Sequence, residues 1–399
     1  MGSQSTSLRY DEDGRERERI WVEHDSGRRP FMRGIMVHSL MARGLSFEDA
    51  FQAADEVRLR ISGRGTVQPS ELAELIRDIL GPGSPAEQQP RIPLPPRILV
   101  GDGPGDYSLF SKGTLSQALL PASINSVDAY EVAREIHRDL LLQGREQVTR
   151  RELRRLSHAA LLERFGSETA ERYLVWRQHR NPEKPVIILL GGTSGAGKTS
   201  LALEVALRLG ITRVLSTDAI RQIMRITLSP ELMPAIHTSS FEAYKSLPWL
   251  GEWEDPVVVG VSAQAWVVSV GVRAMLDRAV EENVSLILDG VGLLPGLIDL
   301  DAYRDVADVI SLVVARLDED GFRTHFKTRE ARQKLRSLER YEENFEAILK
   351  IQKYFLTLAD RYDIPIVDNS TIDSSVLLVI RHVVEAVREA NGFDASEFL

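Results

Sequence analysis

The sequence predicts an α/β fold built on a parallel sheet, and two observations lead to this prediction. From residue 186 onward, short apolar runs alternate with longer amphipathic stretches, the order expected when right-handed crossovers join parallel strands. The first of these runs leads directly into a glycine-rich loop and then into a strong helix-forming segment. We therefore predict a P-loop NTPase fold with a five-stranded parallel sheet of the nucleoside-monophosphate-kinase type, preceded by two mainly α-helical repeats.

The strands are expected at the short apolar runs, and the helices at the longer periodic stretches between them. We expect strands at 186–190, 213–216, 284–289, 309–314 and 364–367, and long helices near 198–209, 262–282, 320–360 and 374–390. Residues 230–260 carry little regular pattern, and long irregular insertions beside a nucleotide site tend to hold the substrate.

The loop after the first of these strands contains the complete pattern G-x-x-x-x-G-K-[ST], from Gly192 to Thr199. Its backbone N–H groups, together with the N-terminus of the following helix, suit phosphate oxygens. Lys198 would place a positive charge on the β- and γ-phosphates, and the Thr199 hydroxyl would ligate Mg²⁺. The predicted cofactors are therefore ATP and Mg²⁺, and the predicted nucleotide-binding residues are Gly192, Thr193, Ser194, Gly195, Ala196, Gly197, Lys198, Thr199 and Ser200.

Two further strands end near carboxylates, and ligands of such sheets gather beyond the carboxyl ends of the strands. Asp218 follows the second strand and could accept the proton of a substrate hydroxyl, or instead cap the helix that begins there. Asp289 ends the third strand and could hold Mg²⁺ directly or through water, or simply open a loop. Beside a complete phosphate loop, we favour the functional interpretation of both residues.

Candidates for holding an anionic substrate come from the helix after Asp218 and from the irregular insertion. Arg221 and Arg225 lie four residues apart on one helix face, which could grip a phosphate or carboxylate or be solvated. The insertion offers several hydrogen-bond donors, although a single histidine is more often structural than catalytic. The predicted substrate-binding residues are Asp218, Arg221, Arg225, His237, Ser239, Ser240, Tyr244 and Lys245.

A segment rich in cations, 318–340, lies between the fourth and fifth predicted strands. It could close over the phosphates and bring an arginine to the transition state, or form an ordinary solvated helix. We select Arg329 as the lid arginine, and it joins Lys198 and Asp218 in the predicted catalytic set.

The part of the chain before residue 186 contains two copies of one small unit. Phe31, Gly34, Leu40 and Ala54 of the first copy correspond to Phe110, Gly113, Leu119 and Ala133 of the second, at a constant offset. The predicted divisions are a disordered tail at 1–19, a first repeat at 20–80, a proline-rich linker at 81–97, a second repeat at 98–177, a linker at 178–185 and a kinase domain at 186–391.

Composition excludes several classes of protein. The formal net charge of −9 argues against general nucleic-acid or anionic-membrane binding. Cysteine is absent, so there are no disulfides and no thiolate ligands, which suits a reducing compartment. The N-terminus lacks the apolar region of a secretory signal. We expect a cytoplasmic enzyme that acts on a small anionic substrate, with neither nucleic acid nor membrane as a partner, and an oligomer is compatible with this sequence.

Six motifs occur in order between residues 185 and 390: GGTSGAGKTS, LSTDAIRQIMR, IHTSSFEAYK, ILDGVGLLPG, HFKTRE with RYEENFEAILKIQKYF, and IPIVDN. Together they resemble the 2-phosphoglycerate kinase family. The resemblance implies transfer of the ATP γ-phosphate to the 3-hydroxyl of 2-phosphoglycerate. By position it implies that the phosphate loop carries the nucleotide, and that Asp218, Arg221 and Arg225 face the phosphoglycerate.

The N-terminal repeats are similar to the ATP-cone-like segment that precedes the kinase in that family. Two copies occur here, and the first begins Val22-Glu23-His24-Asp25 without the basic pair typical of nucleotide-binding cones. The repeats could therefore be an allosteric nucleotide site or a helical docking module without a ligand.

Two alternatives to this function stay open. The chain could be a P-loop kinase for another phosphorylated polyol or sugar acid, or a non-catalytic ATP-sensing regulatory protein. A GTPase is less favoured because the guanine-binding motif N-K-x-D is absent.

Overall fold

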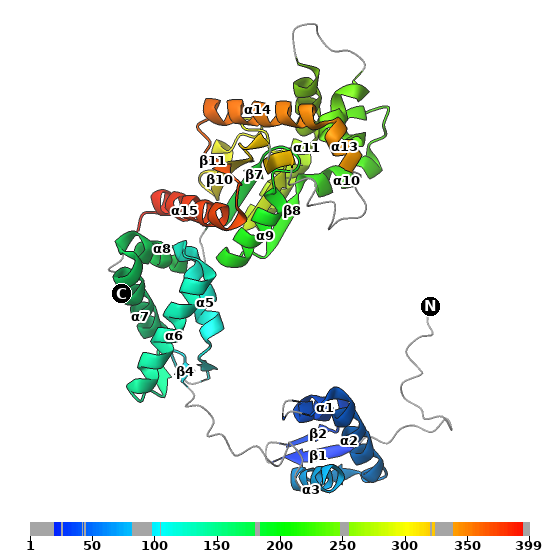
Figure 1. The fold of residues 1–399 in the computed structure, drawn as a ribbon, viewed down its shortest axis with the longest axis vertical. Coiled ribbons are helices and arrows are strands. Elements are labelled where there is room, and N and C mark those ends of the chain that lie inside the picture. Colours follow the sequence, from blue (N-terminus) through cyan, green and yellow to red (C-terminus); the bar gives the residue numbers. More distant parts are fainter. Residues whose placement is uncertain are drawn as a thin grey trace. The chain divides into compact units, whose positions relative to one another are not determined.

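The computed structural model describes residues 20–24, 27–41, 43, 45–81, 98–103, 105–179, 184–247, 255–319, 321–323 and 338–393 (Figure 1). It divides into two compact units, Met1–Pro96 and Arg97–Leu399. The predicted tail at 1–19 and nearly all of the predicted proline-rich linker lie outside the described residues, as do 180–183 of the second linker.

The first unit contains a small sheet and three helices. Strands β1 (Trp21–His24) and β2 (Gly27–Pro30) pair antiparallel, and β3 (Thr66–Val67) pairs parallel to β1, giving the order β2-β1-β3. The helices are α1 (Arg33–Met41), α2 (Phe47–Arg60) and α3 (Pro69–Leu80). Buried apolar residues of β1, β3, α2 and α3 form one core cluster.

The second unit begins with the same arrangement. Strand β4 (Leu99–Val100) pairs antiparallel with β5 (Ser108–Leu109) and parallel with β6 (Gln147–Val148), so the order β5-β4-β6 repeats that of the first unit. Helices α5 (Lys112–Leu119), α6 (Ser126–Leu142) and α7 (Arg150–Phe165) occupy the places of α1, α2 and α3 in chain order. A short helix, η1 (Leu120–Ala122), and a further long one, α8 (Ser167–Gln178), are additions.

The larger part of the second unit contains a five-stranded parallel sheet, as predicted. Its strands are β7 (Val186–Gly191), β8 (Arg213–Ser216), β9 (Leu286–Gly290), β10 (Asp308–Ala315) and β11 (Ile366–Asp368). They lie in the order β11-β10-β7-β9-β8, and every neighbouring pair is parallel. Strand β7, which leads into the phosphate loop, is therefore central and is buried along its whole length.

Helices cover both faces of this sheet (Figure 1). Ile188 and Leu190 of β7 pack against α9 (Lys198–Leu209) and α15 (Ile372–Asn391). The alternate residues Ile187 and Leu189 face α10 (Thr217–Thr227) and α11 (Pro256–Glu281). Helix α14 (Phe345–Arg361) packs with α11 in a further apolar cluster. The side chains of a strand alternate between faces, so an all-apolar strand requires helices on both.

Two predicted helices differ from those observed. The helix expected at 320–360 is not continuous, because α13 (Leu338–Glu343) ends at a turn at Asn344 and α14 begins at Phe345. The helix expected at 262–282 starts earlier, at Pro256, because Asp255 caps it by accepting a hydrogen bond from the Val257 N–H at 2.9 Å. The irregular insertion before it contains the short helices η2 (Pro234–His237) and η3 (Ser240–Ser246), and a further one, η4 (Asp301–Tyr303), follows β9.

Helix α11 is long and apolar enough to cross a membrane by length and composition alone. Its residues Val261, Ala265, Val268 and Val272 are buried among other parts of the fold. That placement is typical of the core helix of a globular domain, so the apolar character of α11 is explained by packing.

The second repeat packs directly against the predicted kinase domain, which contains the five-stranded sheet. The Ser123 hydroxyl donates to the Leu377 carbonyl of α15 at 2.8 Å, and the Trp176 indole N–H donates to the Leu209 carbonyl of α9 at 3.1 Å. Arg388 of α15 pairs with Glu171 of α8 at 3.4 Å. Contacts of this kind explain why the second repeat and the kinase domain belong to one compact unit.

Candidate active site

The phosphate loop leaves β7 and turns back into α9 through glycines in conformations that other residues rarely adopt. The φ angles are +145° at Gly192, +84° at Gly195 and +84° at Gly197. A side chain at Gly192 would collide with the Val314 carbonyl, and one at Gly197 with the Asn369 amide. Glycine is therefore required at both positions for the loop to close against its neighbours.

Lys198, the first residue of α9, is held inside the loop. Its side chain is buried, and its ammonium donates to the Thr193 carbonyl at 2.6 Å. The Thr193 hydroxyl donates to the Ile348 carbonyl of α14 at 3.1 Å, so that side chain is engaged outside the loop. Thr193 can therefore serve a phosphate only through its backbone, whereas Lys198 brings a positive charge.

The Thr199 hydroxyl and the Asp289 carboxylate meet at the end of the central strands. Thr199 Oγ1 donates to Asp289 Oδ2 at 2.7 Å. Asp289 is 2% exposed, and its other oxygen, Oδ1, is buried without a hydrogen-bond partner in the described part of the chain. Burial raises the pKa of the Asp289 carboxyl, against the opposing effects of the Thr199 hydrogen bond and the Lys198 charge.

This pair fits a magnesium ion. A hydroxyl and a carboxylate with an unused oxygen are the protein ligands that Mg²⁺ takes in P-loop sites, where water and phosphate complete its shell. Among the described residues, no group of three or more His, Cys, Asp or Glu side chains is arranged to hold a metal ion. The fit thus rests on the orphaned oxygen of Asp289 beside Thr199.

Asn369, which directly follows β11, supports the loop although β10 separates β11 from β7, and it was not among the predicted site residues. Its amide donates to the Ala196 carbonyl at 2.8 Å, and the residue is 3% exposed. A polar residue directly after a predicted parallel strand is a signal that could have identified it.

Asp218 lies at the exposed start of α10, beside the same edge of the sheet. The N-cap of this helix is Ser216, whose hydroxyl accepts from the Ala219 N–H at 3.1 Å, so Asp218 is not the cap. Ser216 is also paired in register with Asp289 of β9, which places Asp218 close to the predicted magnesium ligands. The charge of Asp218 contributes to the raised pKa of Asp289.

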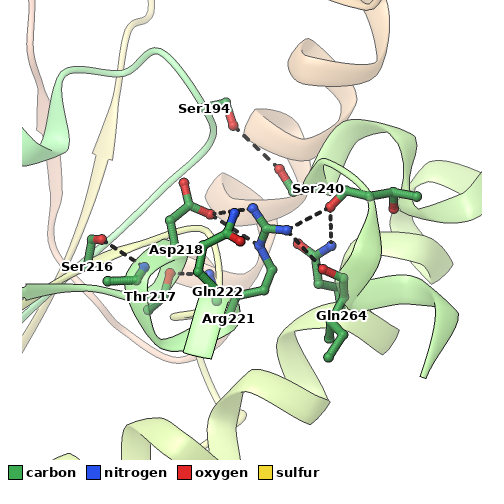
Figure 2. Close-up of polar contacts among 12 residues, drawn as sticks. Ser194, Ser216, Thr217, Asp218, Arg221, Gln222, Ser240 and Gln264 are labelled. Atoms are coloured by element: carbon green, nitrogen blue, oxygen red, sulfur yellow. Dashed lines mark hydrogen bonds and ion pairs between the residues drawn. The ribbon is translucent and has the colours of Figure 1, made fainter. Parts of the chain in front are cut away.

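Arg221 lies between Asp218 and the irregular insertion. Figure 2 shows its guanidinium between the Asp218 carboxylate and the region of Gln264. Arg221 Nη1 donates to the carbonyls of Ile236 and Thr238, at 2.9 and 3.0 Å, and Arg221 Nη2 lies 3.2 Å from Asp218 Oδ1. Its side chain is 12% exposed. Arg221 therefore joins the insertion to the residue proposed to meet the substrate hydroxyl.

Two other predicted substrate residues make local contacts. Arg225 donates to the Gln222 amide oxygen at 3.1 Å, one turn back on α10. His237 Nε2 lies 2.8 Å from the Leu228 carbonyl at the end of α10. Arg225 is half-buried, and the contact of His237 with Leu228 contributes to the shape of the insertion.

The first residues of η3 bring the insertion to the phosphate loop. The hydroxyls of Ser194 and Ser240 lie 3.4 Å apart, which Figure 2 shows across the gap between loop and insertion. Ser239 is the residue before η3, Tyr244 packs against Gly260 of α11, and Lys245 pairs with Glu242 at 3.3 Å. Of the four, Ser240 therefore lies nearest to the nucleotide loop.

Most of the predicted lid, 318–340, lies outside the described residues. Arg329, selected as the lid arginine, is outside the described residues. Arg323 is described, and its guanidinium lies 4.0 Å from the Phe345 ring centroid. Arg323 also lies 3.8 Å from the Glu346 carboxylate, at the start of α14.

Comparison with known proteins identifies the family to which this chain belongs. No family model matches the sequence. The 2-phosphoglycerate kinase of Pyrococcus furiosus is 35% identical over 291 residues, which cover 72% of this chain and 94% of that protein. The 2-phosphoglycerate kinase of Methanococcus vannielii is 35% identical over 300 residues, covering 74% and 94%. This chain belongs to the 2-phosphoglycerate kinase family.

The resemblance predicted from the motifs is thereby confirmed. Relatives in the 2-phosphoglycerate kinase family match over nearly their whole length, and the unmatched length of this chain is comparable to its first unit, Met1–Pro96. Among solved structures, a shikimate kinase from Acinetobacter baumannii aligns with a TM-score of 0.32 at 14% identity, over 55% of this chain and 99% of that one. The family assignment depends on the sequence relatives alone.

Proposed function

We propose that this member of the 2-phosphoglycerate kinase family transfers the γ-phosphoryl group of ATP to the 3-hydroxyl of 2-phosphoglycerate, giving 2,3-bisphosphoglycerate. The observation that supports it best is the meeting of three groups at one edge of the sheet: the phosphate loop, Asp289 and Asp218. Phosphoryl transfer needs little covalent chemistry from the protein, so positioning and charge account for most of the catalysis.

On the nucleotide side, the loop N–H groups and Lys198 would bind the β- and γ-phosphates. Thr199 and Asp289 would hold Mg²⁺, which when bound neutralises charge developing between the β- and γ-phosphates. The hydrogen bond between Thr199 and Asp289 already orients both side chains. The buried carboxylate has its unused oxygen available for the ion or for a water on it.

On the acceptor side, Asp218 would orient the 3-hydroxyl and accept its proton as the phosphoryl group is transferred. Its side chain is 63% exposed, so an incoming alcohol can reach it. Arg225, Ser239, Ser240, Tyr244 and Lys245 are proposed to surround the anionic groups of the acceptor, with Arg221 and His237 holding the insertion that carries them. Arg329 is proposed as the lid arginine.

The test is ADP release by the purified full-length chain with Mg²⁺ and ATP. We expect release to depend on 2-phosphoglycerate and to exceed that seen with 3-phosphoglycerate, glycerol 3-phosphate or inositol phosphate. Faster turnover of one of the other phosphorylated acceptors would assign the chain to that substrate. Binding of ATP without transfer to any acceptor in the panel, together with stable capture of a protein partner, would identify a regulator instead.

The N-terminal repeats are proposed to act as separate modules at 20–80 and 98–177, ahead of a kinase domain at 186–391. Their similarity to ATP-cone segments supports a regulatory nucleotide site, and a docking role is the competing proposal. Nucleotide titration separates the two, because a docking module shows no saturable nucleotide binding outside the phosphate loop. We also propose that the protein is cytoplasmic and that it can form an oligomer.

A further inference from the structure

A cavity of about 640 Å³ lies within the second unit, between the second repeat and the kinase domain. The repeat contributes the strand pair β4 and β5, the helix α5, and parts of α7 and α8. The kinase domain contributes the end of α9 and the residues that follow it, from Leu207 to Ile211, together with Ser285. Helix α9 begins at Lys198, so the cavity lies at the opposite end of the helix, about 18 Å from the phosphate loop at 1.5 Å per residue.

The charged groups that line this cavity are cationic. Arg150, Arg154, Arg177 and Arg208 face it, and no aspartate or glutamate occurs among its described lining residues. Arg150 is already paired with Asp102 and Asp106, which do not line the cavity. The other three arginines come from three different helices, α7, α8 and α9. A chain with a net charge of −9 has thus concentrated positive charge at this place.

Arg208 is the buried member of the group. It is 9% exposed, and its Nη1 is buried without a hydrogen-bond partner in the part of the chain that the structure describes. A buried guanidinium with an unused donor is unfavourable unless an anion or another acceptor satisfies it. Arg208 also lies in the last turn of α9, where the helix dipole favours a cation, but the dipole leaves the unused donor unexplained.

The remaining walls suit an organic molecule that carries the anionic groups. Phe110, Leu115, Leu207 and Ile211 provide apolar surface, and Ser108, Thr114 and Gln117 provide polar side chains. The volume falls within the range of small-molecule sites, which combine apolar walls with a few polar groups. A bare inorganic ion would leave most of this space unused.

The first repeat serves as an internal comparison. Helix α3 begins at Pro69 and the matching helix α7 begins at Arg150, so Arg150 and Arg154 correspond to Pro69 and Ala73 of the first repeat. The first repeat has no described helix equivalent to α8, which carries Arg177. The shared fold therefore does not require these arginines, and they occur in the second repeat, which packs against α9.

We propose that this cavity binds a phosphorylated, polyanionic small molecule and links its concentration to the kinase domain through α9. Two sources have this chemistry: an adenine nucleotide, or a bisphosphorylated three-carbon acid of the kind that the proposed reaction makes. The proposal locates the effector of the second repeat and does not depend on the identity of the phosphoryl acceptor. Binding is measured without turnover, so its failure is distinct from failure of the proposed function.

The experiment measures binding of three probes to the full-length chain by calorimetry: ADP, 2,3-bisphosphoglycerate and inorganic phosphate. Each probe is tested against the wild type, Lys198→Ala, Arg154→Gln and Arg208→Met. A ligand of the cavity should keep its affinity in Lys198→Ala and lose about tenfold in each cavity variant, because charge-assisted hydrogen bonds are removed. If ADP shows this pattern, the effector is an adenine nucleotide. If 2,3-bisphosphoglycerate shows it, the effector is a bisphosphorylated three-carbon acid.

Two controls protect this result. Arg151→Gln removes an exposed arginine of α7 that does not line the cavity, and it should change binding less than twofold. Arg208→Lys keeps the positive charge, and it should restore most of the affinity lost in Arg208→Met if that variant folds with a normal melting temperature. If every probe binds only through Lys198, with the cavity variants unchanged, the proposal is overturned. Binding of inorganic phosphate alone, without either organic probe, also overturns it.

Discussion

The nucleotide side and the acceptor side of the site are organised differently. On the nucleotide side, side chains near the ends of the strands donate hydrogen bonds to fixed acceptors. Lys198 donates to the Thr193 carbonyl of the loop, Thr199 to the Asp289 carboxylate, and Asn369 to the Ala196 carbonyl. On the acceptor side, Arg221 and His237 are bonded to backbone carbonyls around the insertion. The sheet thus positions the nucleotide-side residues directly, whereas Arg221 and His237 fix the conformation of the irregular insertion on the acceptor side.

This difference predicts how substitutions separate kinetically. Loss of a nucleotide-side group that would contact the phosphates or the metal ion should remove stabilisation of the transferring phosphoryl group and lower kcat. A change on the acceptor side should loosen the insertion and appear mainly in KM for the acceptor. The variants below follow from the largest expected effect to the smallest.

Lys198→Ala removes the buried ammonium at the phosphates and should lower kcat/KM for ATP about a thousandfold, since charge stabilisation in a dry site is strong. Initial rates of ADP release measure it. Lys353→Ala removes an exposed lysine of α14 and should leave the rate unchanged. A Lys198→Ala enzyme within tenfold of wild type would show that the nucleotide side is not organised around this residue.

Asp289→Asn should lower kcat about a hundredfold, because the amide is a poor ligand for Mg²⁺. The same variant should raise the melting temperature of the ligand-free chain by about 2 °C at pH 7, because it removes a buried charge.

The sign of this effect follows from the raised pKa of Asp289. Any stability from this carboxyl is fully present below its unfolded pKa and is lost as pH rises through the folded pKa. The advantage of Asp289→Asn should therefore be seen at neutral pH and disappear toward pH 4. Melting curves from pH 4 to pH 7, recorded without nucleotide or metal, measure the difference in melting temperature between Asp289→Asn and the wild type. A difference that increased toward pH 4 would contradict the raised pKa of Asp289.

Arg221→Met should raise KM for 2-phosphoglycerate about thirtyfold with a smaller change in KM for ATP. The substitution removes the donors that hold the carbonyls of Ile236 and Thr238, and the insertion loses its fixed position. Arg225→Met, on the same helix, removes a cation proposed to contact the acceptor and a local bond to Gln222, so it too should raise KM for 2-phosphoglycerate with little change in KM for ATP. Equal effects of the two variants on both substrates would remove the distinction between the two sides.

Asn369→Ala should raise KM for ATP about tenfold and leave KM for the acceptor unchanged. The amide holds one loop carbonyl, and its loss lets the loop relax without removing a group that contacts the phosphates. Steady-state kinetics with each substrate varied in turn measure the split. Asn391→Ala, which removes an amide far along α15, is the matched control.

Much of the fold was predictable because its signals are local. The strands of the parallel sheet are apolar runs, and the phosphate loop is a complete motif, so β7 and α9 were expected within a residue of where they lie. The break at Asn344 was missed because the helical periodicity continues on both sides of it. Such a break is decided by packing of the two helices, which periodicity alone does not encode.

The sequence predicted which residues form the site better than it predicted the contacts between them. A motif identifies Lys198 and Thr199, but nothing local indicates that Ser216 takes the helix cap and leaves Asp218 exposed. The backbone partners of Arg221, the carbonyls of Ile236 and Thr238, are fifteen or more residues away, in a segment without a regular pattern. Asn369 is still more distant in sequence from the loop it supports. Side-chain partners of this kind are set by tertiary structure.

The central claim is that the two sides meet at Asp218, and Asp218→Asn tests it most directly. The substitution keeps the size of the side chain and removes the proton acceptor, with Asp305→Asn as the exposed control. We expect kcat for 2-phosphoglycerate-dependent ADP release to fall about a hundredfold, with KM for ATP unchanged. Wild-type kcat in Asp218→Asn would contradict the account.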